Sequence, residues 1–185
     1  MKEINKKILP HAVAVALFAL ATVVYFSPMI LDGKHLFQGD ILQFNGSARE
    51  IVEYRERTGD EALWTNSMFG GMPAYQISVK FSNNWLIHLN KFLTLGLPSP
   101  AYMIFVAFLG FYIMLLCFKV DPWMAIAGAF AFGLSAYFLI IAGAGHNSKM
   151  RAMAFMPMII GGIYLAYARG KIWIGALILC IALGL

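Results

Sequence analysis

The stretch AYMIFVAFLGFYIMLLCFKVDPWMAIAGAFAFGLSAYFLIIA, residues 101–142, decides the fold of this chain. It consists of two apolar runs, Ala101 to Phe118 and Trp123 to Ala142, joined by Lys119-Val120-Asp121-Pro122. A helix needs about 20 apolar residues to cross the hydrocarbon layer of a bilayer, and each run approaches that length. The joining tetrapeptide is too short for anything but a tight turn. The stretch therefore predicts two antiparallel transmembrane helices.

Three further apolar runs extend this pattern on both sides. They are residues 8 to about 31, residues 152–168, and residues 172 to the end. The chain of 185 residues is 61% hydrophobic and only 12% charged, whereas soluble globular domains carry about 25% charged residues. This composition excludes a soluble domain and, more firmly, a disordered chain. The predicted fold class is an all-α, polytopic transmembrane helix bundle with five spans.

Basic residues predict the orientation of this bundle. Residues 1–7 and the short turns 119–122 and 169–171 all carry cations. Short cytoplasmic loops have an excess of Lys and Arg, so the N-terminus and both turns are expected in the cytoplasm. Residues 8–31 are longer than the apolar core of about 7–15 residues in a signal peptide, and they lack a clean small-x-small cleavage site. Transmembrane helix 1 is therefore expected to be an uncleaved anchor.

Residues 99–185 are expected to hold transmembrane helices 2 to 5. The last of these runs, residues 172–185, has fourteen residues, which is short of the roughly 20 that a span needs. We therefore expect a truncated final helix and an N-terminal portion of a longer protein. The net charge of +5 comes from basic residues that flank the helices, so nucleic acid is not expected as a partner.

Residues 32–98 form a connection far longer than the usual 2–8 residues between helices, and such connections are generally functional or structured. Apolar residues recur at intervals of three and four residues between Asp40 and about Arg57, which predicts an amphipathic helix. A second amphipathic piece is expected from Asn84 to Leu95. Between them, the pair Gly70-Gly71 allows tight backbone turns, and Pro73 is expected to stop regular structure. The topology makes this segment a large extracytoplasmic loop with amphipathic surface helices.

The short connection Gly143-Ala144-Gly145-His146-Asn147-Ser148-Lys149-Met150-Arg151 departs from the charge rule. The topology places it outside the membrane, where short loops are poor in cations. Lys149 and Arg151 also fall in the first turn of a helix, capped by Asn147 or Ser148, where the helix dipole is already positive. An anion would offset these charges, and a lipid phosphate is the anion available at that depth. His146 adds a donor or a proton shuttle.

Two alternatives to an anion site remain open for these cations. Lys149 and Arg151 can extend to lipid head groups, which is common near the ends of membrane helices. They can also pair with acids of the long loop, such as Glu50 or Glu53.

Asp40 lies in Phe37-Gln38-Gly39-Asp40-Ile41-Leu42-Gln43-Phe44, at the start of the expected surface helix. A plain N-cap is the simpler interpretation and the one favoured by helix statistics. A carboxylate near the apolar boundary is also suited to act as a general base, because partial desolvation raises its pKa. The nearby Asp32-Gly33-Lys34 has the composition of a simple turn.

The order of these motifs resembles a known family. It runs from an N-terminal anchor to Gly39-Asp40-Ile41-Leu42-Gln43, then to Trp64 with Phe69-Gly70-Gly71-Met72-Pro73, and then to Ala144-Gly145-His146-Asn147-Ser148-Lys149 before a span containing Pro157. This order resembles the N-terminal part of the bacterial YfhO-type membrane proteins, which are similar to the GT-C class of polytopic glycosyltransferases. The resemblance implies a bacterial plasma-membrane protein of the cell envelope.

The resemblance also implies an activity. Such an enzyme transfers a sugar from a polyprenyl-phosphate carrier to an acceptor glycan outside the membrane, in an inverting displacement. Asp40 matches the acidic residue of the first outer loop and would be the catalytic base. The chain has no Asp-x-Asp pair, so a divalent metal is not indicated, and no other cofactor is implied. The residues expected to bind substrate are Gln43, Trp64, His146, Lys149 and Arg151.

Two other functions remain as alternatives. A transporter or flippase would use the same cations to guide an anionic lipid-linked substrate, and it would have charged or broken helices near the middle of the bilayer. The apolar runs contain almost no such features. A non-catalytic membrane scaffold would use the long loop as a docking surface, and nothing in the sequence excludes it.

Overall fold

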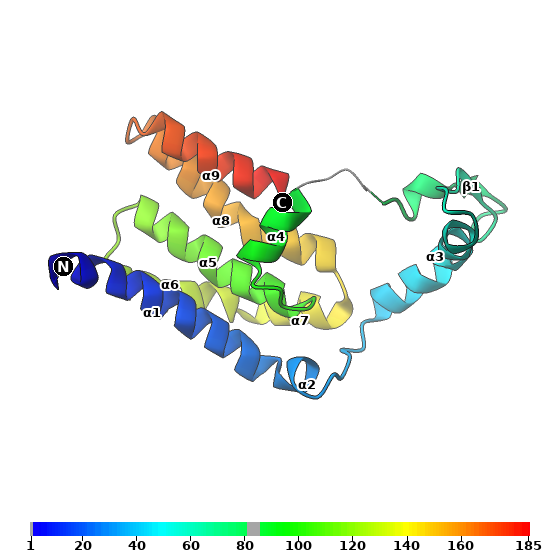
Figure 1. Cartoon of the computed structure of the whole chain (residues 1–185), viewed down its shortest axis with the longest axis horizontal. Coiled ribbons are helices and arrows are strands. Elements are labelled where there is room, and N and C mark those ends of the chain that lie inside the picture. The colour runs from blue at the N-terminus through cyan, green and yellow to red at the C-terminus, as the bar shows by residue number, and fades with distance from the viewer. Residues whose placement is uncertain (1, 81–85) are drawn as a thin grey trace. The chain divides into compact units, whose positions relative to one another are not determined.

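The computed structural model of the chain describes residues 2–80 and 86–185. These residues are almost entirely helical, with one pair of two-residue strands, so the predicted all-α class is confirmed. The chain divides into two compact units (Figure 1). The helical unit comprises Met1–Leu36 and Leu86–Leu185, and the loop unit comprises Phe37–Trp85.

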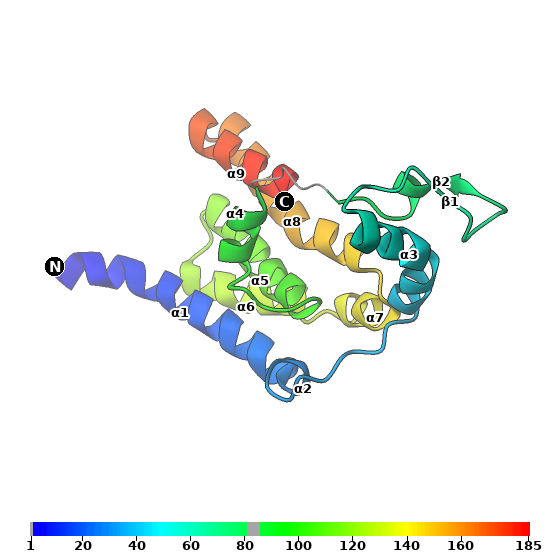
Figure 2. The ribbon, with the colours of Figure 1, turned by 45° about the vertical axis from the view of Figure 1, so that its right-hand side comes forward.

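The helical unit follows the apolar runs closely. Both views show α9 lying along α8 (Figure 1, Figure 2). The elements of this unit are α1 (Lys2–Tyr25), α2 (Ser27–Ile30), α4 (Leu86–Leu93), α5 (Ala101–Cys117), α6 (Pro122–Gly133), α7 (Ala136–Ala144), α8 (Asn147–Tyr167) and α9 (Ile172–Gly184).

Two helices in the described ranges are long and apolar enough to cross a membrane, namely Ile8–Tyr25 within α1 and the whole of α8. The pair α6 and α7 adds a third if it counts as one span. The helices α5 and α9 are apolar but have only 17 and 13 residues, fewer than the roughly 20 of a full span. These features indicate a membrane protein with two or three candidate spans, fewer than the five expected.

The run Trp123 to Ala142 differs from the expectation of one continuous helix. It is broken after Gly133, and α6 and α7 meet at a bend of 42°. A Cβ atom on Gly133 would lie 2.5 Å from the ring of Phe108, so the chain at the break is pressed against α5. Ser135 has extended backbone angles and begins α7 as its N-cap residue. Because the run is predominantly apolar, its composition did not predict the break between α6 and α7.

The core of the helical unit is aromatic where α1 meets α5 and α6. Phe18 is fully buried, and its ring stacks on Phe108 at 5.4 Å and meets the edge of Phe130 at 5.3 Å, measured between centroids. His11 Nδ1 lies 2.8 Å from the hydroxyl of Tyr112, which joins α1 to α5 at a second point. Rings of this size dominate packing energies, so these contacts fix α1 on the bundle.

Small residues let the other helices approach closely, as the spacing of Ala125, Ala129 and Gly133 predicts. Both alanines are fully buried. Gly162 of α8 and Gly175 of α9 face each other, since a Cβ on Gly175 would lie 2.6 Å from the carbonyl oxygen of Gly162. The helix α8 continues through Pro157 without interruption. Packing of α8 on α9 depends on the close approach of their backbones, as in membrane helix pairs.

The loop unit is built on α3 (Gly39–Thr58), which confirms the amphipathic helix predicted from Asp40 to about Arg57. Gly59 ends it with φ +79°, a left-handed conformation that glycine adopts at little cost. The antiparallel strands β1 (Trp64–Thr65) and β2 (Met72–Pro73) follow, and the short helix η1 (Ala74–Gln76) completes the unit.

The second predicted amphipathic piece, Asn84 to Leu95, ends two residues earlier than expected, at Leu93. It corresponds to α4, and its first two residues lie outside the described residues. It belongs to the helical unit.

Candidate functional site

The start of α8 carries the predicted cations. Gly145 ends α7 with φ +94°, and this left-handed turn lets α8 begin only two residues later. His146 is the N-cap residue, and its side chain makes no capping hydrogen bond. The prediction that Asn147 or Ser148 caps the helix is therefore wrong. The N-cap lies one residue before Asn147, because the glycine turn lets the helix begin earlier.

Lys149 and Arg151 have different surroundings. Lys149 is exposed, and its Nζ lies 5.2 Å from the ring centroid of Tyr137 on α7, within cation–π range. Arg151 is half-buried, and its Nε is buried without a hydrogen-bond partner among the described residues. Neither side chain forms an ion pair within the described ranges. Both cations therefore retain the capacity to bind an anion.

The two cations do not share one face of α8. Residues two apart are separated by about 200° around an α-helix, and they do not face each other. Lys149 lies toward α7, so Arg151 extends from a different side of the helix. An anion that contacts both must lie near the helix axis, where the positive end of the dipole adds to the attraction.

The loop acids that were the alternative partners for these cations have partners of their own. Glu53 accepts a hydrogen bond of 2.7 Å from Arg49 Nε, and this contact raises the pKa of Arg49. Glu50 Oε2 accepts hydrogen bonds from the Thr65 hydroxyl at 2.5 Å and from the Asn66 N–H at 2.8 Å. These contacts reduce the need of either acid for another cation.

Asp40 and Gln43 lie together on the wall of a pocket of about 420 Å³ in the loop unit. Both project from the first turns of α3, and Met68, Gln76 and Ile77 also line this open pocket. Gln38 is the N-cap residue of α3, so the simpler interpretation of Asp40 as an N-cap is wrong. Asp40 lies in the first turn, where a negative charge is stabilised by the helix dipole.

Trp64 lines a different pocket, of about 340 Å³, together with Glu50, Tyr54 and Glu61. Its indole rests on the backbone of Gly71, where a Cβ would lie 2.7 Å from the indole Nε1. The side chain is still 57% exposed. The structure therefore separates Trp64 from the pocket of Asp40 and Gln43.

A polar network that sequence reasoning missed holds the strands on α3. Thr65 is buried, and its hydroxyl donates to Glu50, while the Ser67 hydroxyl donates to the carbonyl oxygen of Ser47 at 2.8 Å. The bond from Thr65, and then that from Asn66, lower the pKa of Glu50. Thr, Ser and Asn in a turn-rich stretch gave no signal that distinguished these residues from ordinary loop residues.

The predicted site residues therefore fall into three groups. Asp40 and Gln43 share one pocket, Trp64 lines another, and His146, Lys149 and Arg151 lie at the start of α8 in the helical unit. Among the residues that the structure describes, no group of three His, Cys, Asp or Glu is arranged to hold a metal ion.

No family model, curated protein or solved structure matches this chain. The residues and their geometry are therefore the basis for the functional argument.

Proposed function

We propose that this protein is a YfhO-type, GT-C-like membrane glycosyltransferase of the bacterial envelope. In this proposal the chain crosses the plasma membrane several times with its N-terminus in the cytoplasm, and the loop unit lies outside. The donor is a sugar on a polyprenyl-phosphate carrier, and the acceptor is an extracytoplasmic glycan. No metal takes part.

The observation that supports this proposal most is the pair of cations at the start of α8. Lys149 and Arg151 have no carboxylate partner in the described ranges, and the Arg151 Nε is buried without a hydrogen-bond acceptor. A buried donor without a partner costs free energy. A phosphate at the positive end of α8 would supply the missing negative charge and acceptor.

The proposed reaction is an inverting displacement at the anomeric carbon. The acceptor hydroxyl oxygen attacks that carbon, and Asp40 takes the hydroxyl proton as general base. The bond from the anomeric carbon to the carrier phosphate oxygen breaks, and its electron pair leaves with the phosphate. Lys149, Arg151 and His146 stabilise the charge that develops there. Gln43 hydrogen-bonds the substrate beside Asp40, and Trp64 stacks on a more distant sugar of the glycan.

The first test measures transfer from a radiolabelled lipid-linked sugar in membranes that contain the full-length protein. Loss of a general base reduces the rate about 10²–10⁴-fold. The transfer rate of the Asp40→Asn protein is therefore expected to decrease by a factor in that range. Asp60→Asn is the matched control, because Asp60 is an exposed acid of the same unit. A fully active Asp40→Asn protein would exclude the proposed role of Asp40.

The second test measures retention of undecaprenyl phosphate by native mass spectrometry. Lys149→Ala/Arg151→Ala is expected to lose the lipid. Arg169→Ala/Lys171→Ala is the matched control, because this pair has the same chemistry and lies in the turn after α8. Equal retention by both double variants would show that the cations of α8 are ordinary head-group anchors.

The break between α6 and α7 favours a second candidate, a transporter or flippase of an anionic lipid-linked substrate. Transporters place broken helices near the middle of the bilayer, and the 42° bend between Gly133 and Ala136 is a feature of this kind. Uptake of a lipid-linked sugar by reconstituted vesicles, without transfer to an acceptor, would support this alternative. A scaffold role is indicated if variants of Asp40 and Lys149 change neither transfer nor uptake.

A further inference from the structure

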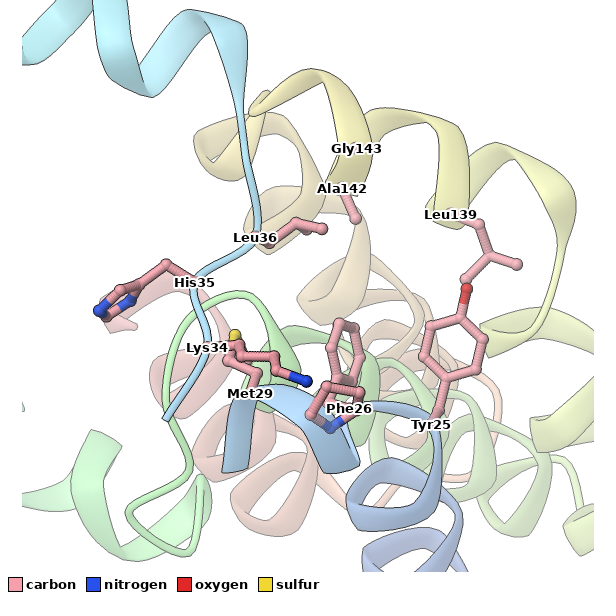
Figure 3. A pocket seen from close by; sticks show the side chains of 10 residues that line it. Tyr25, Phe26, Met29, Lys34, His35, Leu36, Leu139, Ala142 and Gly143 are labelled. Carbon is pink, nitrogen blue, oxygen red and sulfur yellow. The ribbon is translucent and has the colours of Figure 1, made fainter. Parts of the chain in front are cut away.

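A pocket that the proposed reaction does not use lies within the helical unit, where α1 ends (Figure 3). Its volume of about 410 Å³ falls within the range of about 300–1,000 Å³ typical of ligand pockets. The segment after α2 and the second half of α7 complete its walls. The apolar residues that line it are Phe26, Pro28, Met29, Leu36, Leu139 and Ala142.

The polar groups of this pocket belong to Tyr25, Lys34 and His35. In Figure 3 the ammonium of Lys34 extends toward Phe26, whereas the His35 ring points away from the pocket. Lys34 forms an ion pair of 3.3 Å with Asp32, and the two side chains are 70% and 56% exposed. An exposed pair of this kind contributes little, so Lys34 can exchange Asp32 for a second anion. The pocket thus combines an apolar interior with a cation at its edge.

The position of the pocket indicates which molecules reach it. It begins at Tyr25, the last residue of the candidate span Ile8–Tyr25. The end of an apolar span is where the hydrocarbon layer meets the head groups, and exposed tyrosines are enriched there. Tyr25 is 51% exposed. A pocket at this depth has both lipid chains and lipid phosphates within reach.

We propose that this pocket binds one hydrocarbon chain of a phosphate-headed lipid, with the phosphate on Lys34. The apolar walls offer nothing to a small soluble anion beyond the contact with Lys34 at the edge, whereas they can bury the hydrocarbon chain of a lipid. The Lys34 ammonium favours a phosphate head over a neutral one. This site is separate from the cations of α8 and does not depend on the proposed sugar transfer.

The test uses a prenyl phosphate that carries a diazirine on its chain, with the full-length protein in detergent. After irradiation, the label is expected on peptides that contain Phe26 to Met29 and Leu139 to Gly143. Unlabelled phosphatidylglycerol is expected to compete for the site, whereas inorganic phosphate at the same concentration is not. Displacement by inorganic phosphate, or a label spread evenly over the bundle, overturns the proposal.

Two variants fill the pocket from α7. Ala142→Leu adds volume to its wall, and Gly143→Leu adds a side chain where a Cβ would meet nothing within 4 Å. Each is expected to reduce labelling about tenfold, because the walls bury most of a ligand's surface. Gly46→Leu is the matched control, because that glycine is also helical and also has open space beside it. Labelling that survives in both filled variants overturns the proposal.

The head-group contact is tested with Lys34→Ala. This variant is expected to bind the prenyl phosphate about fivefold more weakly and the corresponding prenyl alcohol as well as the wild type does. Lys91→Ala removes another exposed lysine and is expected to change neither. A Lys34→Ala protein that still prefers the phosphate overturns the head-group assignment. Lys149→Ala/Arg151→Ala is expected to keep the label, so failure of the transfer reaction leaves this result unaffected.

Discussion

Replacement of Gly110 by alanine is expected to open the interface between α5 and α8. A Cβ at this position would lie 2.5 Å from the carbonyl oxygen of Ala154 and 3.4 Å from Cγ of Met158. The first atom belongs to the backbone of α8, so no side-chain rotation relieves the contact. The two helices must separate by about 1 Å before ordinary van der Waals distances return.

The expected magnitude is the difference between two effects. Overpacking of a close contact costs about 1–3 kcal/mol, while alanine is better than glycine within a helix by about 1 kcal/mol. The net destabilisation is therefore about 1 kcal/mol, the middle of the resulting range. That net value applies to unfolding of the helices; opening of the interface leaves both helices intact, so only the overpacking cost acts on it, and about 1–3 kcal/mol raises the population of the opened state at least about fivefold.

The two cysteines provide the assay for this opening. Cys117 is only 7% exposed, and it lies in the same interface, since a Cβ on Gly161 would be 3.2 Å from its Sγ. Cys180 is free and exposed, so it serves as the internal reference. Alkylation of Cys117 by N-ethylmaleimide, relative to Cys180, is expected to be at least about fivefold faster in Gly110→Ala.

The control variant, Gly143→Ala, is expected to have the opposite effect on stability. Gly143→Ala places the same methyl group where nothing lies within 4 Å. It is therefore expected to stabilise the protein by as much as about 1 kcal/mol through helix propensity alone. If Gly110→Ala leaves both the melting temperature and the relative alkylation rate unchanged, close contact of α5 with α8 is refuted.

Three further predictions concern local contacts. Glu50 has a lowered pKa, so its contribution to the loop unit is complete above the ordinary value of 4.5 and is lost as the pH falls through the lower folded value; Glu50→Gln is expected to remove this acid dependence in hydrogen exchange of residues 63–76. Gly71→Ala forces φ +125° on a residue with a Cβ and collides with Trp64, which is expected to destabilise the strand pair by about 1–3 kcal/mol in the same experiment. Asp121 caps α6 through the N–H groups of the next two non-proline residues, so Asp121→Ala is expected to cost about 1 kcal/mol in thermal unfolding.

The helices were predictable where one local signal dominates. The run Ala101 to Phe118 and α5 agree to one residue at the C-terminal end, because no proline or charged residue interrupts the apolar run. The amphipathic periodicity predicted the extent of α3 equally well, and the helix ends at Gly59. Asp40 and Gln43 were both expected to act on the substrate, and the structure places both in one pocket.

The features that the sequence did not predict depend on contacts between distant residues. At the break after Gly133, the chain lies directly against the ring of Phe108 from another helix. The attachment of the strands to α3 depends on Glu50 and Thr65, which are fifteen residues apart. The pocket of Trp64 is likewise distinct from that of Asp40 because the strand pair positions the indole over Gly71. Periodicity and composition contain no information on such pairings.

The geometry of α8 restricts how its two cations can act together. Lys149 contacts Tyr137 on one side, and Arg151 extends from a side about 200° away. A phosphate beside the helix would therefore contact one cation and lie far from the other. A phosphate near the axis, beyond His146, is accessible to both, and the His146 side chain makes no capping hydrogen bond to the helix end. If the protein binds a carrier phosphate here, the helix end is the central element of the site, and Lys149 and Arg151 flank it from opposite sides.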